Sequence, residues 1–207
     1  KIKSPSGSIS KNIKRFGRQL EIMMDLFLIK HKLKNDFPLV REATCAHPKR
    51  AAVMVMLYPK DNATHILMTR RATHLKYHAG EMSFPGGMFE EDQDDDLLAT
   101  ALRETKEELA VEIDQGDVFG RLYIVYARLG FEITPFVSVL PSAPLYVPAE
   151  SEVGEVLEIP FAPLLSTQKR AVRNNLSEEG VMYKFRHHEI WGASAKILDQ
   201  IAHMNTY

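Results

Sequence analysis

The feature that most constrains the fold is a glycine pair, an acidic loop and a glutamate-rich helix that follow one another. They occupy FPGGMFEEDQDDDLLATALRETKEELAV, residues 84–111. Four residues recur at helical spacing and predict the buried face of a helix over 97–110: Leu98, Leu102, Thr105 and Leu109. The aspartates at 94–96 precede this helix, where negative charge suits the helix dipole and an aspartate can cap the first turn.

Three glutamates of this helix lie unusually close together. Glu104 and Glu108 are about 40° apart around the helix axis, with Glu107 further round and Arg103 at the spacing of an ion pair with Glu107. Clustered like charges repel, so the pattern favours a positive partner at the edge of the core. Oxygen donors of this kind suit Mg²⁺ or Mn²⁺. We therefore predict Glu104, Glu107 and Glu108 as metal ligands, aided by the backbone at Gly87, where no side chain obstructs the ion.

Composition narrows the classes of partner. The 207 residues are 45% hydrophobic with a net charge of −1, which fits one globular domain and gives no overall basic field for nucleic acid or an anionic membrane. Cys45 is the single cysteine, so no intramolecular disulfide can form, and we interpret it as structural. No apolar run approaches the roughly 20 residues of a membrane span. We expect a small-molecule substrate and a cytoplasmic location; the oligomeric state stays undetermined.

The remaining elements predict a mixed sheet with helices on both faces. We expect strands over 51–59, 64–72, 118–128 and 131–141, and a strand leading into a short element over 152–165. A long loop fills 73–96, and a strand from 183 precedes a helix from about 191. Residues 9–33 predict an amphipathic helix that packs on the domain, with a membrane-surface helix as the weaker alternative. The domain boundaries follow as 1–45 for this helical lead-in and 46–207 for the main domain.

The central stretch resembles the Nudix box, G-x5-E-x7-R-E-U-x-E-E-x-G-U, in which U is bulky and apolar. The matching positions are Gly87, Arg103, Glu104, Glu107, Glu108 and Val111. Thr105 replaces an apolar residue and Ala110 replaces a glycine. The loop before Arg103 is two residues longer than the pattern, which leaves the middle glutamate without a counterpart. We predict that Asp94 or Asp95 orients Arg103 instead; the alternative is that the acidic run is only a solvated helix cap.

The segment LMTRRATHLKYHAGEMSFPGG, residues 67–87, is similar to a signature that the coenzyme A pyrophosphatase branch of this family carries before its Nudix box. The resemblance, with the local basic charge, makes these residues candidates for substrate binding: Arg70, Arg71, Lys76, Gly80, Phe84 and Gly86. Arginine can hold a phosphate through two hydrogen bonds, whereas a lysine offers a point charge. His74 and His78 are interpreted as structural hydrogen-bonding groups.

The resemblance implies a fold and a reaction. The fold is an α/β class Nudix-type α/β/α sandwich with a mixed central sheet. The reaction is hydrolysis of the pyrophosphate of coenzyme A or acyl-CoA to 3′,5′-ADP and (acyl)phosphopantetheine, with Mg²⁺ or Mn²⁺. The predicted catalytic residues are Glu104, Glu107, Arg103 and Glu152. The general base stays open between Glu104, Glu107 and a downstream acid, Glu152 or Glu155, whose plain interpretation is solvent exposure.

Two other classes of function compete with this one. The first is a Nudix pyrophosphatase for another nucleoside diphosphate derivative, such as ADP-ribose or a dinucleotide, or an enzyme that removes RNA caps. The upstream signature argues against another nucleoside diphosphate derivative. The near-neutral net charge argues against an enzyme that removes RNA caps, which would need a basic surface for RNA. The second is a nucleotide-binding module without catalysis, which the complete set of glutamates disfavours.

Overall fold

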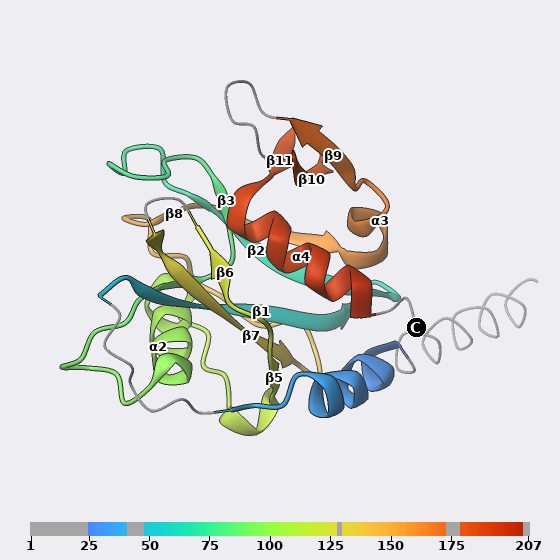
Figure 1. Ribbon diagram of the computed structural model, residues 1–207, viewed down its shortest axis with the longest axis horizontal. Helices are drawn as coiled ribbons and strands as arrows, with labels where there is room; N and C mark the ends of the chain where they lie inside the picture. Colours follow the sequence, from blue (N-terminus) through green and yellow to red (C-terminus); the bar gives the residue numbers. More distant parts are fainter. Residues whose placement is uncertain (1–24, 41–47, 128–129, 173–178, 205–207) are drawn as a thin grey trace, which may run out of the picture.

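The computed structural model describes residues 25–40, 48–127, 130–172 and 179–204 (Figure 1). A helix over 25–36 comes first. The elements that follow are β1 (Arg50–Lys60), β2 (Ala63–Arg71), β3 (Met82–Ser83), β4 (Gly86–Met88), α2 (Leu97–Leu109), a 3₁₀ turn (Gln115–Asp117), β5 (Val118–Arg121), β6 (Val125–Tyr126), β7 (Glu132–Val139), β8 (Val153–Pro160), α3 (Phe161–Leu165), β9 (Lys169–Val172), β10 (Glu179–Phe185), β11 (His188–Ile190) and α4 (Gly192–Met204).

The central sheet is mixed, with β1 in its middle. β1 runs parallel to β7 and antiparallel to both β2 and β4. The length of β1 allows this double pairing: residues 51–53 pair with β4 and residues 56–60 pair with β2. The glycine pair is thereby fixed to the first half of the central strand. A second sheet of three strands, β11-β10-β9, stands beside it.

Alternation along β1 separates two hydrophobic layers. Val55 and Leu57 face a cluster that includes the residues of α4, whereas Met54 and Met56 face a cluster that includes those of α2. Helices therefore cover both faces of the sheet (Figure 1). This confirms the predicted α/β/α arrangement around a mixed central sheet.

The helix over 25–36 packs on the α4 side of the sheet. Leu26, Ile29 and Leu33 are buried in the same hydrophobic cluster as α4. Packing on the domain is confirmed for these residues, while residues 9–24 and Cys45 lie outside the described part of the chain. The boundary at residue 45 stays a prediction. Within the described residues, every helix is too short or too polar to cross a bilayer.

Several short strands differ from the sequence prediction. The 73–96 loop contains β3 and β4, and β9 was not predicted. The expected strand over 118–128 is broken into β5 and β6, and between them the side chain of Gln200 in α4 hydrogen-bonds both the N–H and the carbonyl of Tyr123. The strand from 183 is a hairpin of β10 and β11 that turns at Arg186, where φ is 55°. These short strands depend on pairing with segments that are distant in the sequence, and local β-propensity does not predict such pairing.

Candidate active site

The ends of α2 are held by specific hydrogen bonds. Asp96 caps the first turn, since its side chain accepts from the Ala99 amide at 2.8 Å. At the other end, the amides of Val147 and Ala149 donate to the carbonyls of Leu109 and Glu108, each at 2.8 Å. These carbonyls have no partner within the helix itself. The loop before β8 therefore fixes the turn of α2 that carries Glu108.

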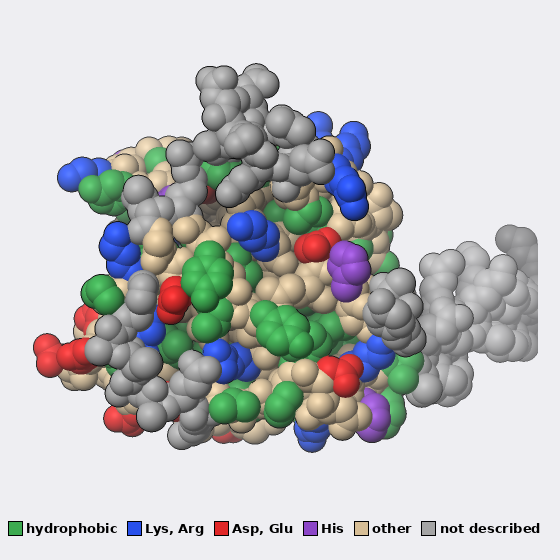
Figure 2. Space-filling model, viewed as in Figure 1, with side chains coloured by type: hydrophobic (Ala, Val, Ile, Leu, Met, Phe, Trp, Pro, Cys, Tyr) green, Lys and Arg blue, Asp and Glu red, His purple; other side chains and the backbone are tan. Residues whose placement is uncertain are grey.

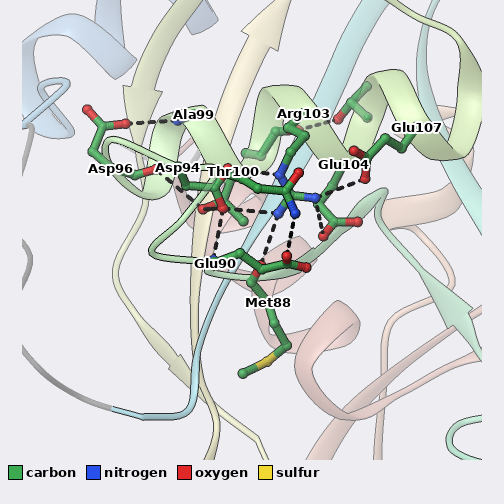
Figure 3. Close-up of polar contacts among 12 residues, drawn as sticks. Met88, Glu90, Asp94, Asp96, Ala99, Thr100, Arg103, Glu104 and Glu107 are labelled. Atoms are coloured by element: carbon green, nitrogen blue, oxygen red, sulfur yellow. Dashed lines mark hydrogen bonds and ion pairs between the residues drawn. The ribbon is translucent and has the colours of Figure 1, made fainter.

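Arg103 links the acidic loop to two of the glutamates (Figure 3). Its Nε and Nη2 donate to the two carboxylate oxygens of Asp94 at 2.8 and 3.0 Å. Its Nη1 donates to Glu104 Oε1 at 3.0 Å and to Glu107 Oε2 at 2.9 Å, and Nη2 also reaches the Met88 carbonyl at 3.2 Å. One guanidinium thus holds both glutamates in place.

Asp94 is the acid that contacts Arg103, and Asp95 is exposed. Asp94 is buried and also accepts from the Glu90 amide at 3.0 Å and the Thr100 hydroxyl at 2.9 Å. Burial raises the pKa of Asp94, but the hydrogen bonds from Arg103, the Glu90 amide and Thr100 outweigh it and hold that pKa below its usual range. The sequence left Asp94 and Asp95 as alternatives and missed Thr100.

Glu108 corrects the expectation that all three glutamates line the edge of the core. It is 4% exposed, whereas Glu107 is exposed and Glu104 is half-buried. Burial, reinforced by the negative charge of Glu104, raises the pKa of Glu108 to about 8, against the opposing charge of Arg71. Its Oε2 is buried with no hydrogen-bond partner among the described residues. A buried carboxylate in this state is costly unless a positive group joins it.

The glycine pair closes over these glutamates. A Cβ on Gly87 would lie 2.3 Å from Glu104 Oε1, and one on Gly86 would lie 2.2 Å from the Ala52 carbonyl oxygen. Gly86 also adopts φ of +151°. Its backbone hydrogen bond to Glu108 lowers the pKa of that carboxyl, opposing burial. Neither position has room for a side chain, so the carboxylates lie directly against backbone.

Glu152 approaches the same cluster from the start of β8. It is exposed, and its carbonyl accepts from the Ala72 amide at 2.8 Å, which ties it to the end of β2. Burial raises the pKa of Glu104; Arg103 opposes this, and the charges of Glu107 and Glu152 add to it. Glu155 lies further along β8 and faces His188, whose Nε2 is 3.4 Å from Glu155 Oε2.

The predicted substrate residues separate into four groups. Arg71 faces the glutamates, because its charge acts on Glu108, and its Nε is buried with no partner among the described residues. Arg70 lines a separate pocket with Gly80. Lys76 is exposed on the loop after β2. Phe84 is 3% exposed and packs in the core on the α4 side, so its side chain stabilises the fold and we omit it from the proposed substrate contacts.

The two histidines of this loop make structural contacts. His74 Nε2 lies 3.1 Å from the Ser151 carbonyl, which joins the loop to the segment that carries Glu152. His78 pairs with Glu81 at 2.9 Å. At the base of the loop the Gly80 amide donates to the Arg71 carbonyl at 3.1 Å, with φ of +73° at Gly80. The loop that follows Arg71 is therefore closed at its base and tied to β8.

Comparison with known proteins identifies the class. The NUDIX domain family matches residues 48–169, which is more than half of the chain. The chain belongs to the Nudix family, and it is a Nudix hydrolase. Two relatives named "Uncharacterized Nudix hydrolase NudL", from Yersinia pestis (strain Pestoides F) and Yersinia pseudotuberculosis serotype O:1b (strain IP 31758), are each 34% identical over 159 residues, 74% of this chain and 78% of theirs.

A solved structure shares the fold. The crystal structure of a MutT/nudix family protein from Enterococcus faecalis superposes with a TM-score of 0.52 at 14% identity, and covers 84% of this chain and 70% of that chain. At this identity the likeness concerns the fold alone.

Nudix hydrolases generally use divalent metal ions, and the donors here fit such an ion in kind. All are oxygens, and the buried Glu108 Oε2 has no hydrogen-bond partner in the part of the chain that the structure describes. In this conformation no three carboxylate, histidine or cysteine side chains of the described residues form a ligand cluster. Arg103 accounts for this, since it holds Glu104 and Glu107 on its own nitrogens. Glu107 is exposed, and its carboxylate would have to leave Arg103 Nη1 to serve as a third ligand.

Proposed function

We propose that this Nudix hydrolase cleaves the pyrophosphate bond of coenzyme A or acyl-CoA, giving 3′,5′-ADP and (acyl)phosphopantetheine. One observation carries the proposal: the signature segment 67–87 is part of the glutamate site. Arg71 acts on Glu108, Gly86 contacts Glu108 through its backbone, and Gly87 lies against Glu104. A signature that builds the site is a stronger guide to substrate than one located elsewhere.

The proposed metal ligands are Glu104, Glu107 and Glu108, with the backbone at Gly87 as a further donor and Mg²⁺ or Mn²⁺ as the ion. When bound, such an ion supplies positive charge against the phosphate oxygens and acidifies the attacking water. The pKa of Glu108, near 8 without metal, means that the ion must displace a proton at neutral pH.

The chain's own residues have three proposed roles. Arg103, fixed by Asp94, keeps Glu104 and Glu107 at the substrate side of α2. Arg71, whose Nε has no hydrogen-bond partner among the residues that the structure describes, donates to the diphosphate. Glu152 accepts a proton from the attacking water, with Glu104 and Glu107 as the other candidates for this role. Lys76, on the exposed loop, is proposed to meet the 3′-phosphate of the substrate.

A substrate panel tests the proposal. Coenzyme A, dephospho-CoA, acetyl-CoA, ADP-ribose and NADH are incubated with the chain and Mg²⁺, and the products are separated by chromatography. Glu108→Gln, purified in parallel, tests the glutamate site in the same assay, and a mock purification from cells without the chain controls for contaminating hydrolases. We expect kcat/KM for coenzyme A or acetyl-CoA to exceed that for ADP-ribose at least tenfold, with 3′,5′-ADP as a product.

The other outcomes discriminate the alternatives. Faster turnover of ADP-ribose or NADH would assign the chain to another nucleoside diphosphate derivative. Binding of these compounds without Mg²⁺-dependent turnover would favour a non-catalytic module. Turnover of coenzyme A that is unchanged in Glu108→Gln would overturn the glutamate site itself.

A further inference from the structure

A pocket that the glutamate site does not use lies beside the end of β2. Its volume is about 280 Å³. The lining residues are Arg70, Gly80, Met82, His187, His188 and Glu189. Met82 belongs to the hydrophobic cluster on the α4 side of the sheet, whereas Arg71, the next residue after Arg70, faces Glu108. The pocket is therefore next to the glutamate site but opens on the other side of β2.

Two segments far apart in sequence build its walls. One is the β2–β3 region, and the other is the β10–β11 hairpin near the end of the chain (Figure 1). β11 contacts β3, and the Ser194 hydroxyl at the start of α4 donates to the Met82 carbonyl at 3.0 Å. The walls are thus fixed to each other by the fold.

The pocket contains polar groups without partners. His188 is 6% exposed, and its Nε2 has no hydrogen-bond partner among the described residues; Glu155 Oε2 lies 3.4 Å away but makes no hydrogen bond. Within the described part of the chain, the hydrogen bond of Arg70 runs from Nε to the Gly80 carbonyl at 3.4 Å. Buried polar groups in this state are typical of a ligand site.

The charges of the pocket argue against a phosphate. Arg70 and Glu189 are the charged residues of the lining, and the charges of Glu155, Arg70 and Arg186 act on His188 from within or beside it. Burial lowers the pKa of His188 and Glu155 only partly opposes this, which favours the neutral ring. One guanidinium and one carboxylate in the lining leave no surplus positive charge for a phosphate dianion.

The same groups suit a neutral planar ring that carries both donors and acceptors. Carboxylates accept from an amino group, while guanidinium and imidazole N–H groups donate to ring nitrogens. His187 is exposed, and its ring lies 3.9 Å from that of His188, which offers a surface for stacking. The volume of about 280 Å³ is slightly below that of typical ligand pockets, which run from roughly 300 to 1,000 Å³. That size holds a nucleobase but not a whole coenzyme.

We propose that this pocket binds the adenine base of the substrate, with Glu189 accepting from the exocyclic amino group and Arg70 and His188 donating to ring nitrogens. This inference rests on one part of the proposed function, namely that the substrate contains an adenine nucleotide. It adds the β10–β11 hairpin to the substrate site.

Binding of AMP tests it without turnover. AMP, IMP and inorganic phosphate are titrated into the ¹⁵N-labelled full chain, and amide shifts are followed at the β10–β11 hairpin. IMP replaces the amino group by a carbonyl oxygen. We expect AMP to shift hairpin amides and to bind about tenfold more tightly than IMP, the effect of one charge-assisted hydrogen bond. Glu189→Gln should remove this preference, whereas the matched control Glu112→Gln, an exposed glutamate on another surface, should keep it.

Three results would overturn the assignment: equal affinity for AMP and IMP, an unchanged preference in Glu189→Gln, or hairpin shifts with inorganic phosphate as large as those with AMP. The kinetic arm compares coenzyme A with 1,N6-etheno-CoA, which lacks the free amino group. AMP binding at the hairpin without hydrolysis of coenzyme A would leave the adenine site standing and reject the proposed substrate. Hydrolysis of coenzyme A without amide shifts at the hairpin on addition of AMP would support the proposed substrate and reject the adenine site.

Discussion

Replacing Asp94 by asparagine should weaken the fold far more than the same change at its neighbour. The Asp94 carboxylate accepts hydrogen bonds from Arg103 Nε and Nη2, the Thr100 hydroxyl and the Glu90 amide. Asparagine keeps the shape but turns an N–H group toward one of these donors. Removing one partner of a buried ion pair costs about 3–5 kcal/mol. Because Arg103 is still 16% exposed, we expect about 3 kcal/mol.

Urea unfolding at pH 7 measures this difference. Asp95→Asn is the matched control, since Asp95 is exposed in the same loop and the change in charge is identical. It should stay within about 0.5 kcal/mol of the unmodified chain. A misplaced Arg103 should also lower kcat by roughly 10- to 100-fold in Asp94→Asn.

The pH dependence gives a second check. The pKa of Asp94 is lowered in the folded chain, so its stabilisation is present above the unfolded pKa of about 3.9 and is lost as the pH falls further. The stability difference between the unmodified chain and Asp94→Asn should therefore shrink below about pH 4. A difference under about 1 kcal/mol at pH 7, or one that stays constant down to pH 3.5, would refute the reasoning.

Three further changes probe the same helix. Burial raises the pKa of Glu108 in the folded chain, so in EDTA the unmodified chain should lose on the order of 4 kcal/mol of stability as the pH rises from about 4.5 to 8. Glu108→Gln should not show this loss. If urea unfolding gives parallel pH curves for the two proteins, the prediction is wrong. Ala110→Gly should raise the Tm by about 2–4 °C, because Ala110 ends α2 in the left-handed region at φ of 56°; a lower Tm in calorimetry would count against this. Asp96→Ala should cost about 1 kcal/mol through loss of the N-cap with kcat within twofold, and a large drop in rate would show that Asp96 does more than cap.

The sequence predicted the helix and the layers because their signals are local. The spacing of Leu98 and Leu109 needs only the helical period, and α2 begins and ends within a residue of the prediction. Alternation along β1 likewise separates the two faces. The short strands were missed because β4 consists of Gly86, Gly87 and Met88, whose pairing depends on the free first half of β1 rather than on propensity.

The site was predicted in residue type but not in burial. A helical wheel places Glu104 and Glu108 side by side, yet it does not record that the packing around them buries Glu108 and leaves Glu104 half-buried. The choice between Asp94 and Asp95 also needed the fold of the loop, in which the Asp94 amide donates back to the Glu90 carbonyl. The pocket at His188 joins segments more than a hundred residues apart, and no local pattern points to it.

The packing at Gly86 and Gly87 has a consequence for how sequences like this one are sorted. A methyl group at either position would overlap the Ala52 carbonyl or the Glu104 carboxylate. At Gly86 the overlap is with backbone and φ is +151°, so a saturation library should reject substitutions there whichever nucleotide is the substrate. At Gly87 a side chain would displace the Glu104 carboxylate, so substitutions there should lower activity. Acidic side chains gather at the edge of the molecule where the loop before α2 runs (Figure 2). Comparing homologues at the two glycines would show which of them keep this close packing. Comparing them at positions 70, 76 and 189 would instead group them by the substrate that we expect them to bind.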